Sequence, residues 1–588
     1  MSISFEFNFM MVNAFAASVA LLLGSASACT NYMVTRGASA DNSTQIAYNS
    51  DGQSLYGFMT HLPAGDHAPN AQRKVYEFTS GVYLGSIPEA PHTYNVIGNT
   101  NEHQLTIAET TFDGLKSLAE PYNGSILDYY SLMWITLQRT RTAREAIKLM
   151  DELTQKYGYA STGESFSIAD TKEVWIMEMI GKGKEEKGSV WVARRVPDGA
   201  VCGHANQARI QQWPRNDPDA MYANDTVAFA RRMGLYPAEK PDEAFSFSDT
   251  FDPISVVGAR ACELRVWNWF RLALGATDGA AFADSHLAYV QGKNLTQRMP
   301  LWVHVGNRKI DVNQTMWAMR ERYRGTYFDQ RSDVGAGPFH SEIRVRPTQW
   351  SLGKRVYTNE RNVGYQGTFF NFVSQGRGWL PDVIGALTWF GVDDAAHMPR
   401  VPMYANSKAA PETYAEGNGN TTTFEMRSAY WIHNLVANLV YSRYDLIGEE
   451  VKQRIIKDER RYFEDVRRID AQAARLLSVH GEEAVKDFLT KFSTTTADSH
   501  VDDWIQFWQH LTVKYRDGLV VSPGAPPAKP QDKPQPANAK AQGYDDKWYT
   551  RIVKETKDHY LIFPMDGAAA EIESAATERD MQKMRLVR

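Results

Sequence analysis

The stretch Ala26-Ser27-Ala28-Cys29-Thr30-Asn31-Tyr32 joins an apolar leader to alternating, strand-like sequence. The leader carries an apolar run over residues 14–23 and ends in the A-x-A pattern of a signal-peptide cleavage site. It lacks Lys and Arg, which departs from the usual positively charged start. We expect residues 1–28 to be a signal peptide, so that Cys29 becomes the first residue of a mature chain exported to the periplasm or the extracellular space.

A cysteine in the first position of a chain carries a thiol and a free α-amino group on the same residue. The α-amino group has an ordinary pKa of about 7.7–8.0, so a good fraction is unprotonated near neutral pH. Such an amine can activate its own thiol as a base, as it does in hydrolases that begin with threonine. Cys29 is therefore the candidate nucleophile.

Length and composition describe a large globular protein. Of 588 residues, 43% are hydrophobic and 23% are charged, which leaves room for two to four domains. The net charge of −5, from 64 basic and 69 acidic residues, gives no electrostatic reason to expect a nucleic acid partner. Beyond the leader no apolar run reaches about 18 residues, so we expect no membrane span in the mature chain. The oligomeric state stays open.

The three cysteines, Cys29, Cys202 and Cys262, are too few for a disulfide framework. We expect Cys202 and Cys262 to be free, buried thiols. The sequence contains neither C-x-x-C nor H-E-x-x-H, so it gives no case for zinc or for another metal cofactor.

The hydrophobic pattern predicts an antiparallel α+β fold. Residues 30–35 and 45–49 are typical of two strands of a hairpin, which we expect to hold Cys29 at a sheet edge. A capping box, Thr142-Ala143-Arg144-Glu145, predicts the start of a helix. Strands that cluster between helical blocks favour α+β layers over alternating βαβ units. Further strands are predicted at residues 105–111, 166–170, 174–179, 190–193 and 201–206.

The order of these patterns predicts five segments. They are the signal peptide (1–28), a catalytic domain (29–415), a helical region packed on it (416–520), a Pro-rich linker (521–545) and a C-terminal tail (546–588). Residues 300–410 are rich in Gly, Pro and aromatic side chains and predict loops or further strands. Apolar stripes at helical spacing near residues 432–440 and 504–511 predict core-facing helices.

Many short motifs follow one another in a distinctive order along the chain. They are Cys29–Tyr32, Gly37–Asp41, Tyr48–Asp51, Asn99–Glu102, Ala108–Thr111, Glu164–Asp170, Trp175–Glu178, Ala193–Asp198, His204–Arg209 and Trp389–Asp394. Together they resemble the dipeptidase A family of cysteine peptidases, which are N-terminal-nucleophile hydrolases, and the resemblance covers roughly Cys29 to residue 520. It implies a four-layer αββα sandwich with a helical C-terminal extension, hydrolysis of dipeptides of varied side chains, and no metal or organic cofactor.

The resemblance also implies roles for individual residues. Cys29 would attack the scissile carbonyl and form a thioester that water clears. Asp51 matches a carboxylate that orients the terminal amine, with a turn-capping aspartate as its alternative. Asn206 matches an asparagine that stabilises the oxyanion, with an ordinary strand-end residue as its alternative. Thr110 or Thr111 stands where related acylases carry a second such asparagine.

A dipeptidase must read both charged ends of its substrate. Glu109 is a candidate for the substrate amine, and Arg209 for binding its carboxylate. Related acylases carry an arginine that lowers the thiol pKa at the position of Tyr48, so Arg36 or Arg209 is a candidate replacement. His204 is expected to be structural.

Other functions remain open at this point, among them that of an inactive family member acting as a binding module; two more change the chemistry. One is an N-acyl amide amidase of the penicillin or bile-salt acylase type, which keeps the fold and changes the substrate. The other is a lipid-anchored envelope binding protein, because small residues before a cysteine also resemble a lipoprotein cleavage site. Lipoprotein maturation acylates the α-amine of the cysteine and removes the base, so it excludes the enzymatic mechanism.

Overall fold

The computed structural model describes residues 29–344, 347–529, 531, 533 and 535–561. The predicted signal peptide, residues 1–28, and the end of the predicted tail, residues 562–588, lie outside the described residues. The predicted class, a mixed α+β protein with several antiparallel sheets, is confirmed.

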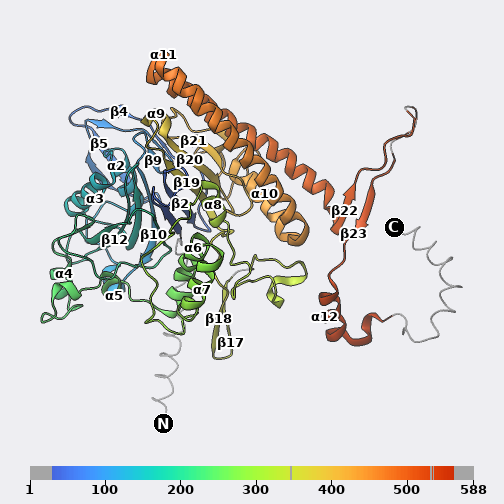
Figure 1. The fold of residues 1–588 in the computed structure, drawn as a ribbon, viewed down its shortest axis with the longest axis horizontal. Helices are drawn as coiled ribbons and strands as arrows, with labels where there is room; N and C mark the ends of the chain where they lie inside the picture. The colour runs from blue at the N-terminus through green and yellow to red at the C-terminus, as the bar shows by residue number, and fades with distance from the viewer. Residues whose placement is uncertain (1–28, 345–346, 530, 532, 534, 562–588) are drawn as a thin grey trace, which may run out of the picture.

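A seven-stranded antiparallel sheet contains the predicted N-terminal hairpin (Figure 1). Thr30 of β1 pairs with Asn49 of β2. β1 lies between β14 and β2, so Cys29 precedes an interior strand and the expectation of a sheet edge was wrong. An interior strand is hydrogen-bonded on both sides, which fixes the backbone beside the nucleophile. In spatial order the strands are β16 (Trp302–His304), β14 (Ala200–His204), β1 (Thr30–Val34), β2 (Thr44–Asp51), β19 (Thr368–Gly376), β20 (Ala386–Val392) and β21 (Val401–Tyr404).

An eight-stranded antiparallel sheet holds four of the other predicted strands, as β10 to β13. The turn between β11 and β12 is closed by a hydrogen bond of 3.1 Å from the Asp170 amide to the Glu173 carbonyl. The strand predicted at residues 201–206 joins the first sheet as β14. In spatial order this sheet contains β15 (Ala220–Tyr222), β13 (Ser189–Arg195), β12 (Val174–Gly181), β11 (Gly163–Ala169), β10 (Thr106–Asp113), β9 (Thr100–Asn101), β8 (Val96–Ile97) and β3 (His61–Leu62).

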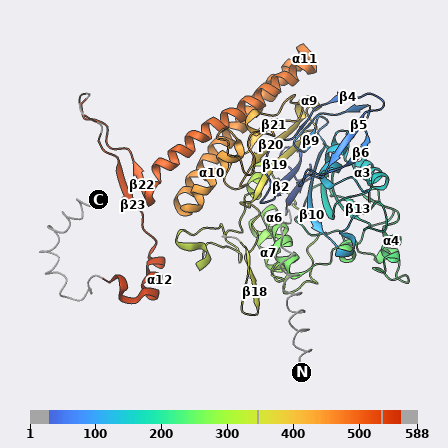
Figure 2. The same cartoon turned by 180° about the vertical axis from the view of Figure 1, so that it is seen from behind.

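The two sheets meet where β1 and β2 contact β10 and β11 (Figure 2). All residues of β1, β2 and β11 are buried, as expected for strands covered on both faces. α2 and α3 contact strands of the eight-stranded sheet, whereas α6, α8, α10 and α11 contact strands of the seven-stranded sheet. These helices are α2 (Tyr129–Leu137), α3 (Ala143–Tyr157), α6 (Leu264–Leu274), α8 (Val312–Ala318), α10 (Ala429–Ser442) and α11 (Tyr444–Lys514).

Helix α3 begins at the predicted capping box. The Thr142 hydroxyl accepts from the Glu145 amide, and the Glu145 carboxylate accepts from the Thr142 amide. Its predicted apolar face is buried against the sheet. Four further helices are α4 (Thr226–Arg232), α5 (Phe247–Phe251), α7 (Ala276–Val290) and α9 (Asp382–Gly385).

The mixed region of residues 300–410 contributes β19, β20 and β21 to the seven-stranded sheet. β19 pairs directly with β2, with Asn371 opposite Asn49, so this late segment completes the sheet beside the N-terminal strands. The same region contains an exposed hairpin, β17 (Gln349–Leu352) and β18 (Arg355–Thr358). Two further strand pairs come early in the sequence. They are β4 (Gly65–Asp66) with β7 (His92–Thr93) and β5 (Gln72–Tyr76) with β6 (Tyr83–Pro88).

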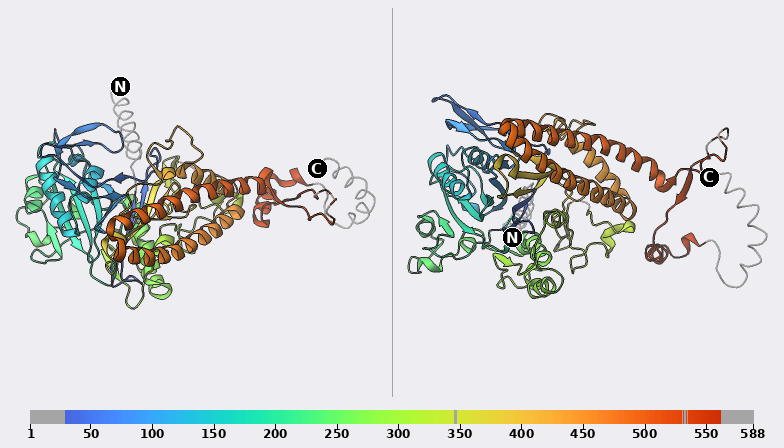
Figure 3. Two further views of the ribbon diagram at one scale, coloured as in Figure 1. Left: turned by 90° about the horizontal axis from the view of Figure 1, so that it is seen from above. Right: turned by 45° about the horizontal axis from the view of Figure 1, so that its top comes forward.

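The helical region forms a long antiparallel hairpin within α11 (Figure 3). The helix is interrupted at Gly481, whose φ of 76° and ψ of −177° turn the chain back. The two arms then contact each other, because His500 bonds to the Tyr462 hydroxyl at 3.1 Å and Lys514 bonds to Glu450 at 2.8 Å. The apolar stripes at 432–440 and 504–511 supply buried side chains, as predicted.

The C-terminal segment extends away from the body of the molecule (Figure 1). The sequence predicted as a linker, residues 521–545, contains the end of β22 (Leu519–Ser522) and all of β23 (Asn538–Ala541), which pair with each other, and it is followed by α12 (Asp546–Thr556). His340 holds the start of α12 through Asp545 at 2.7 Å. Within the described ranges, no helix is both long enough and apolar enough to cross a membrane.

Replacing Gly481 with Ala is expected to lower the free energy of unfolding by about 1–3 kcal/mol, because a Cβ is strained at this backbone conformation. Gly448→Ala is the matched control in the same helix. An added Cβ there meets only Val440 Cγ1 at 3.5 Å, so this change is expected to stabilise the helix by up to about 1 kcal/mol. Urea unfolding followed by circular dichroism measures both, and equal effects would refute the assigned turn.

Candidate active site

Cys29 lies immediately before β1, in the seam between the two sheets. Its side chain is 1% exposed. The sulfur is 3.6 Å from the Tyr48 hydroxyl, 3.6 Å from Glu109 Oε1 and 3.8 Å from Ser50 Oγ. Tyr48 also donates to Glu109, which fixes both groups beside the sulfur. The predicted nucleophile therefore contacts a carboxylate and two hydroxyl groups.

The surroundings of Cys29 oppose the thiolate in the uncleaved chain. Burial raises the pKa of its thiol well above the ordinary value, and the carboxylates of Glu109 and Asp51 raise it further. The Asp51 amide and the Tyr48 hydroxyl act in the opposite direction by donating hydrogen bonds. In this chain the Cys29 nitrogen is part of a peptide bond to Ala28, so no terminal amine stands beside the sulfur.

Asp51 ends β2 and is buried next to the nucleophile. Its carboxylate accepts from Arg361 at 2.7 Å and from the Thr368 hydroxyl at 2.6 Å. Burial raises the pKa of Asp51, and the Arg361 guanidinium and the Thr368 hydroxyl act against that rise. The ion pair allows a carboxylate to remain charged in the seam. The structure thus brings Asp51 to Cys29, together with an arginine that the sequence motifs did not single out.

Arg265 is a second arginine at the nucleophile, and it is fully buried. It follows a π-helical segment, Gly258–Glu263, of the kind that often marks functional sites. One guanidinium nitrogen donates to the Cys29 carbonyl at 2.6 Å and to the Thr30 hydroxyl at 2.9 Å. The other donates to Asn206 Oδ1 at 2.9 Å. Arg265 therefore links the predicted nucleophile to the predicted oxyanion residue.

Asn206 adopts a left-handed backbone conformation, with a φ of 61°. Its amide nitrogen donates to the Thr111 carbonyl at 2.6 Å, and its oxygen faces Arg265. These two bonds fix the orientation of the amide. One of its two N–H groups has no hydrogen-bond acceptor within the described part of the chain. An asparagine can adopt this backbone conformation more readily than most residues.

The threonines at the second oxyanion position are engaged elsewhere. Thr110 shares a hydrogen bond of 2.7 Å with His204 Nδ1, and Thr111 donates to Glu164 at 2.9 Å. His204 Nε2 lies 2.7 Å from the Ser167 hydroxyl. Burial lowers the pKa of His204 to about 3, so it stays neutral and joins the two sheets, in the structural role expected for it.

The structure does not bring Arg209 or Arg36 to the nucleophile. The Arg209 guanidinium pairs with Glu263 at 2.8 Å, and its other nitrogens donate to backbone carbonyls. This side chain is buried and neutralised within the core, because a buried charge needs such partners. Arg36 is exposed in the turn after β1. Arg265 and Arg361 lie near Cys29 instead, where Arg209 or Arg36 had been expected to provide a positive charge.

Glu109 and Glu164 form a pair of interacting carboxyl groups beside the nucleophile. Glu164 is the first residue of the Glu164–Asp170 motif, which is part of the family resemblance but implied no role for this residue. All three cysteines are free, with Cys202 buried and Cys262 partly buried. Within the described residues, no group of three or more His, Cys, Asp or Glu side chains is arranged to hold a metal ion.

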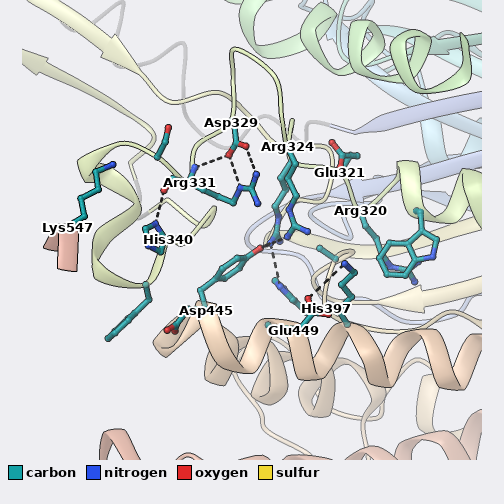
Figure 4. A pocket seen from close by; sticks show the side chains of 18 residues that line it. Arg320, Glu321, Arg324, Asp329, Arg331, His340, His397, Asp445, Glu449 and Lys547 are labelled. Atoms are coloured by element: carbon teal, nitrogen blue, oxygen red, sulfur yellow. Dashed lines mark hydrogen bonds and ion pairs between the residues drawn. The ribbon is translucent and has the colours of Figure 1, made fainter. Parts of the chain in front are cut away.

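A pocket of about 810 Å³ lies away from these residues, between the loop 320–340 and the start of α11 (Figure 4). Its arginines are paired with acids, as in Arg324 with Glu342 at 2.6 Å and Arg331 with Asp329 at 2.6 Å. Its lining includes none of the groups that contact the Cys29 sulfur. Size alone therefore does not make this pocket the reactive centre.

The chain belongs to peptidase family C69. The model of this family matches residues 28–457, so the match begins one residue before Cys29 and covers most of the chain. The family resemblance seen in the motifs is confirmed, and the protein is a member of a family of peptidases.

Three relatives illustrate the similarity. A probable dipeptidase of Latilactobacillus sakei is 26% identical over 438 residues, which are 71% of this chain and 82% of the relative. Dipeptidase A of Lactobacillus helveticus is 24% identical over 450 residues, 72% of this chain and 83% of the relative. A probable dipeptidase of Salmonella dublin is 29% identical over 335 residues, 53% of this chain and 71% of the relative.

The depressed pKa of His204 makes stability depend on pH. The unfolded chain binds a proton at His204 below about pH 6.5, whereas the folded chain stays neutral there down to about pH 3. Stability should therefore fall as the pH falls through this window, by up to about 1.4 kcal/mol per pH unit from this group. Urea unfolding at pH 7, 6 and 5 measures the free energy of unfolding. This free energy should fall less steeply with falling pH in His204→Gln than in the parental protein. The surface change His92→Gln should keep the parental slope, and an unchanged slope in His204→Gln would contradict this account.

Proposed function

We propose that this protein is an exported cysteine dipeptidase whose nucleophile is Cys29, exposed as the first residue when the leader is removed. The observation that carries the proposal is the placement of the Cys29 sulfur within 3.6 Å of Glu109 and Tyr48 and beside the Asp51 amide. Membership of a peptidase family supports it, as do relatives named dipeptidase.

Cleavage after Ala28 converts the Cys29 nitrogen into a free amine next to its own thiol. The amine takes the thiol proton, and the sulfur attacks the scissile carbonyl of the peptide. The proton then passes to the leaving amine, which departs as the second amino acid and leaves a thioester on Cys29. Water, deprotonated by the same amine, attacks the thioester and releases the first amino acid. The carboxylates of Glu109 and Asp51 favour the ammonium formed in each proton transfer.

The neighbours of Cys29 hold its backbone and charge in place. Arg265 fixes the Cys29 carbonyl at 2.6 Å, so removal of the leader leaves the residue anchored. Asp51, held by Arg361, orients the new amine. Asn206 stabilises the oxyanion with its second N–H group, because Arg265 and Thr111 already fix the rest of its amide. One such donor contributes about 2.7–4 kcal/mol to the stability of the transition state.

The fold we propose for this centre is the four-layer αββα sandwich of N-terminal-nucleophile hydrolases. Supporting contacts are those of β1 and β2 with β10 and β11, with α2 and α3 on one sheet and α6 and α8 on the other. Such a sandwich buries the residue at the start of β1 in its central seam. The helices after residue 416 then add an extension to one side.

Export is the other half of the proposal, and the state of the mature N-terminus tests it. Expression with the native leader, followed by intact mass and N-terminal sequencing, should give a chain that begins with an unmodified Cys29. A diacylglyceryl or N-acyl adduct on Cys29 would favour the lipid-anchored binding protein. A working enzyme that still begins upstream of Cys29 would reject the mechanism.

Replacement of Cys29 tests the nucleophile. Cys29→Ala should reduce hydrolysis of free dipeptides to the uncatalysed background, because no thioester can form. Cys202→Ser is the control, since this buried thiol donates only to the Leu301 carbonyl at 3.2 Å and a hydroxyl can do the same. Assays of processed protein should include acyl amides, and faster turnover of these than of dipeptides would favour an amidase.

Neutralising Asp51 tests the positioning of the amine. Asp51→Asn should lower kcat by about 10²-fold with little change in KM, since a displaced base slows chemistry more than binding. Asp198→Asn, in a surface turn where this carboxylate accepts from the Gly37 amide at 2.5 Å, should leave kcat unchanged. A rise in KM alone for the Asp51 variant would instead indicate a role in binding.

A further inference from the structure

Two buried carboxyl groups beside Cys29 face each other without a cationic partner in the described part of the chain. Glu109 and Glu164 are each 1% exposed. They hydrogen-bond to each other, and no N–H or hydroxyl group of another described residue donates to the enclosed Oε2 atom of either. A buried negative charge without a cation beside it is costly, so a ligand that brings a positive charge and hydrogen-bond donors to this position is favoured.

The sheet register places the two carboxyl groups on one face. Glu109 of β10 pairs with Phe166 of β11, and Glu164 stands two residues before Phe166. Residues two apart on a strand point to the same side, so Glu109 and Glu164 are diagonal neighbours whose long side chains can meet. Their other oxygens are anchored, Glu109 Oε1 by Tyr48 and Glu164 Oε1 by the Thr111 hydroxyl at 2.9 Å.

The pair carries a negative charge that the described protein does not neutralise. Neither carboxyl forms an ion pair with any Lys, Arg or His of the described ranges. Burial raises the pKa of both groups, and the proximity of Glu109 raises that of Glu164 well above its ordinary range. A proton shared between the two carboxyl groups leaves the pair with a single negative charge. Around them stand the Cys29 thiol, the Asp113 carboxyl and the phenols of Tyr48, Tyr129, Tyr130 and Tyr159.

We propose that Glu109 and Glu164 together bind the α-ammonium group of the substrate, and that Glu164 is a determinant of specificity for an unblocked N-terminus. This inference rests on the proposed dipeptidase function. A primary ammonium offers three N–H donors and one positive charge. The pair offers one negative charge and two carboxyl oxygens to which no N–H or hydroxyl group of another described residue donates.

The distance from the Glu109–Glu164 pair to the Cys29 sulfur determines which peptide bond of the substrate is cleaved. Glu109 Oε1 lies 3.6 Å from the Cys29 sulfur. In a peptide, only the α-carbon separates the terminal nitrogen from the carbonyl carbon of the same residue. An ammonium bound at the pair therefore places the first carbonyl at the sulfur, so the enzyme removes one residue from a free N-terminus. An N-acylated peptide brings no positive charge to the pair. The buried negative charge of Glu109 and Glu164 then has no cationic partner, which is costly.

Glu164→Gln tests the pair without changing its size. The ratio of kcat/KM for a free dipeptide to that for the same dipeptide N-acetylated should fall at least about tenfold. The fall should come from a higher KM for the free dipeptide, with kcat within about threefold of wild type. Glu164→Asp, which keeps the charge, should recover part of the ratio. The matched control is Glu178→Gln, a buried carboxyl of the next strand that accepts from the Arg209 and Ile210 amides; its ratio should equal that of wild type.

The pH dependence gives a second readout that a purely structural role would not move. The ammonium binds the ionised pair, so KM for the free dipeptide should rise as the pH falls through the raised pKa of the pair. This acid limb should be altered in Glu164→Gln and preserved in Glu178→Gln. An unaltered acid limb together with an unchanged substrate ratio in a folded, active Glu164→Gln enzyme overturns the inference.

Competition with the wild-type enzyme covers the case in which the Glu164 variants do not fold. A free dipeptide should inhibit hydrolysis of a second dipeptide, whereas its N-acetylated form should bind at least about tenfold more weakly. Equal inhibition by both forms rejects the ammonium site while leaving the dipeptidase proposal intact. If processed wild-type protein hydrolyses no free dipeptide through Cys29, the proposed function itself fails, and the two failures are thereby distinguished.

Discussion

The packing of β1 and β2 against β10 and β11 is the constraint on which the rest of the structure depends. It removes Cys29, Asp51 and Glu109 from water. In such a place each charge must be matched by a partner or suppressed by a proton. Arg361 pairs with Asp51, whereas Glu109 and Glu164 interact with each other and the pKa of each is raised. The arrangement of charges around the sulfur is therefore a consequence of closing the two sheets on each other.

The same constraint explains why the uncleaved chain and the mature enzyme should differ in chemistry. With Ala28 attached, the seam contains acids and phenols beside the sulfur, and they raise the pKa of the thiol. In the proposed mechanism, removal of the leader introduces one cation-forming group into this acidic environment. The surrounding carboxylates that disfavour a thiolate alone favour an ammonium next to it. Activation would then depend on a single new charge at a position that Arg265 already holds.

Local sequence patterns predicted the elements whose structure depends on near neighbours. The Thr142–Glu145 capping box and the β1–β2 hairpin follow from short-range hydrogen bonds and alternation, and both are present. The place of β19 was not predictable in this way, since it pairs with β2 across more than 300 residues of sequence. The sequence pattern of residues 300–410 predicted loops or further strands, but it did not predict which strand β19 would pair with.

The sequence by itself determined that a strand follows Cys29, that a second strand precedes Asp51 in a hairpin with the first, and that the motifs belong to one peptidase family. Only the tertiary structure decided which charges surround them. Arg265 and Arg361 reach the site from segments more than 200 residues away, and Arg209 is instead neutralised by Glu263 in the core. The reason is physical: the pairing of buried charges depends on distances across packed layers, and spacing along a chain does not encode those distances.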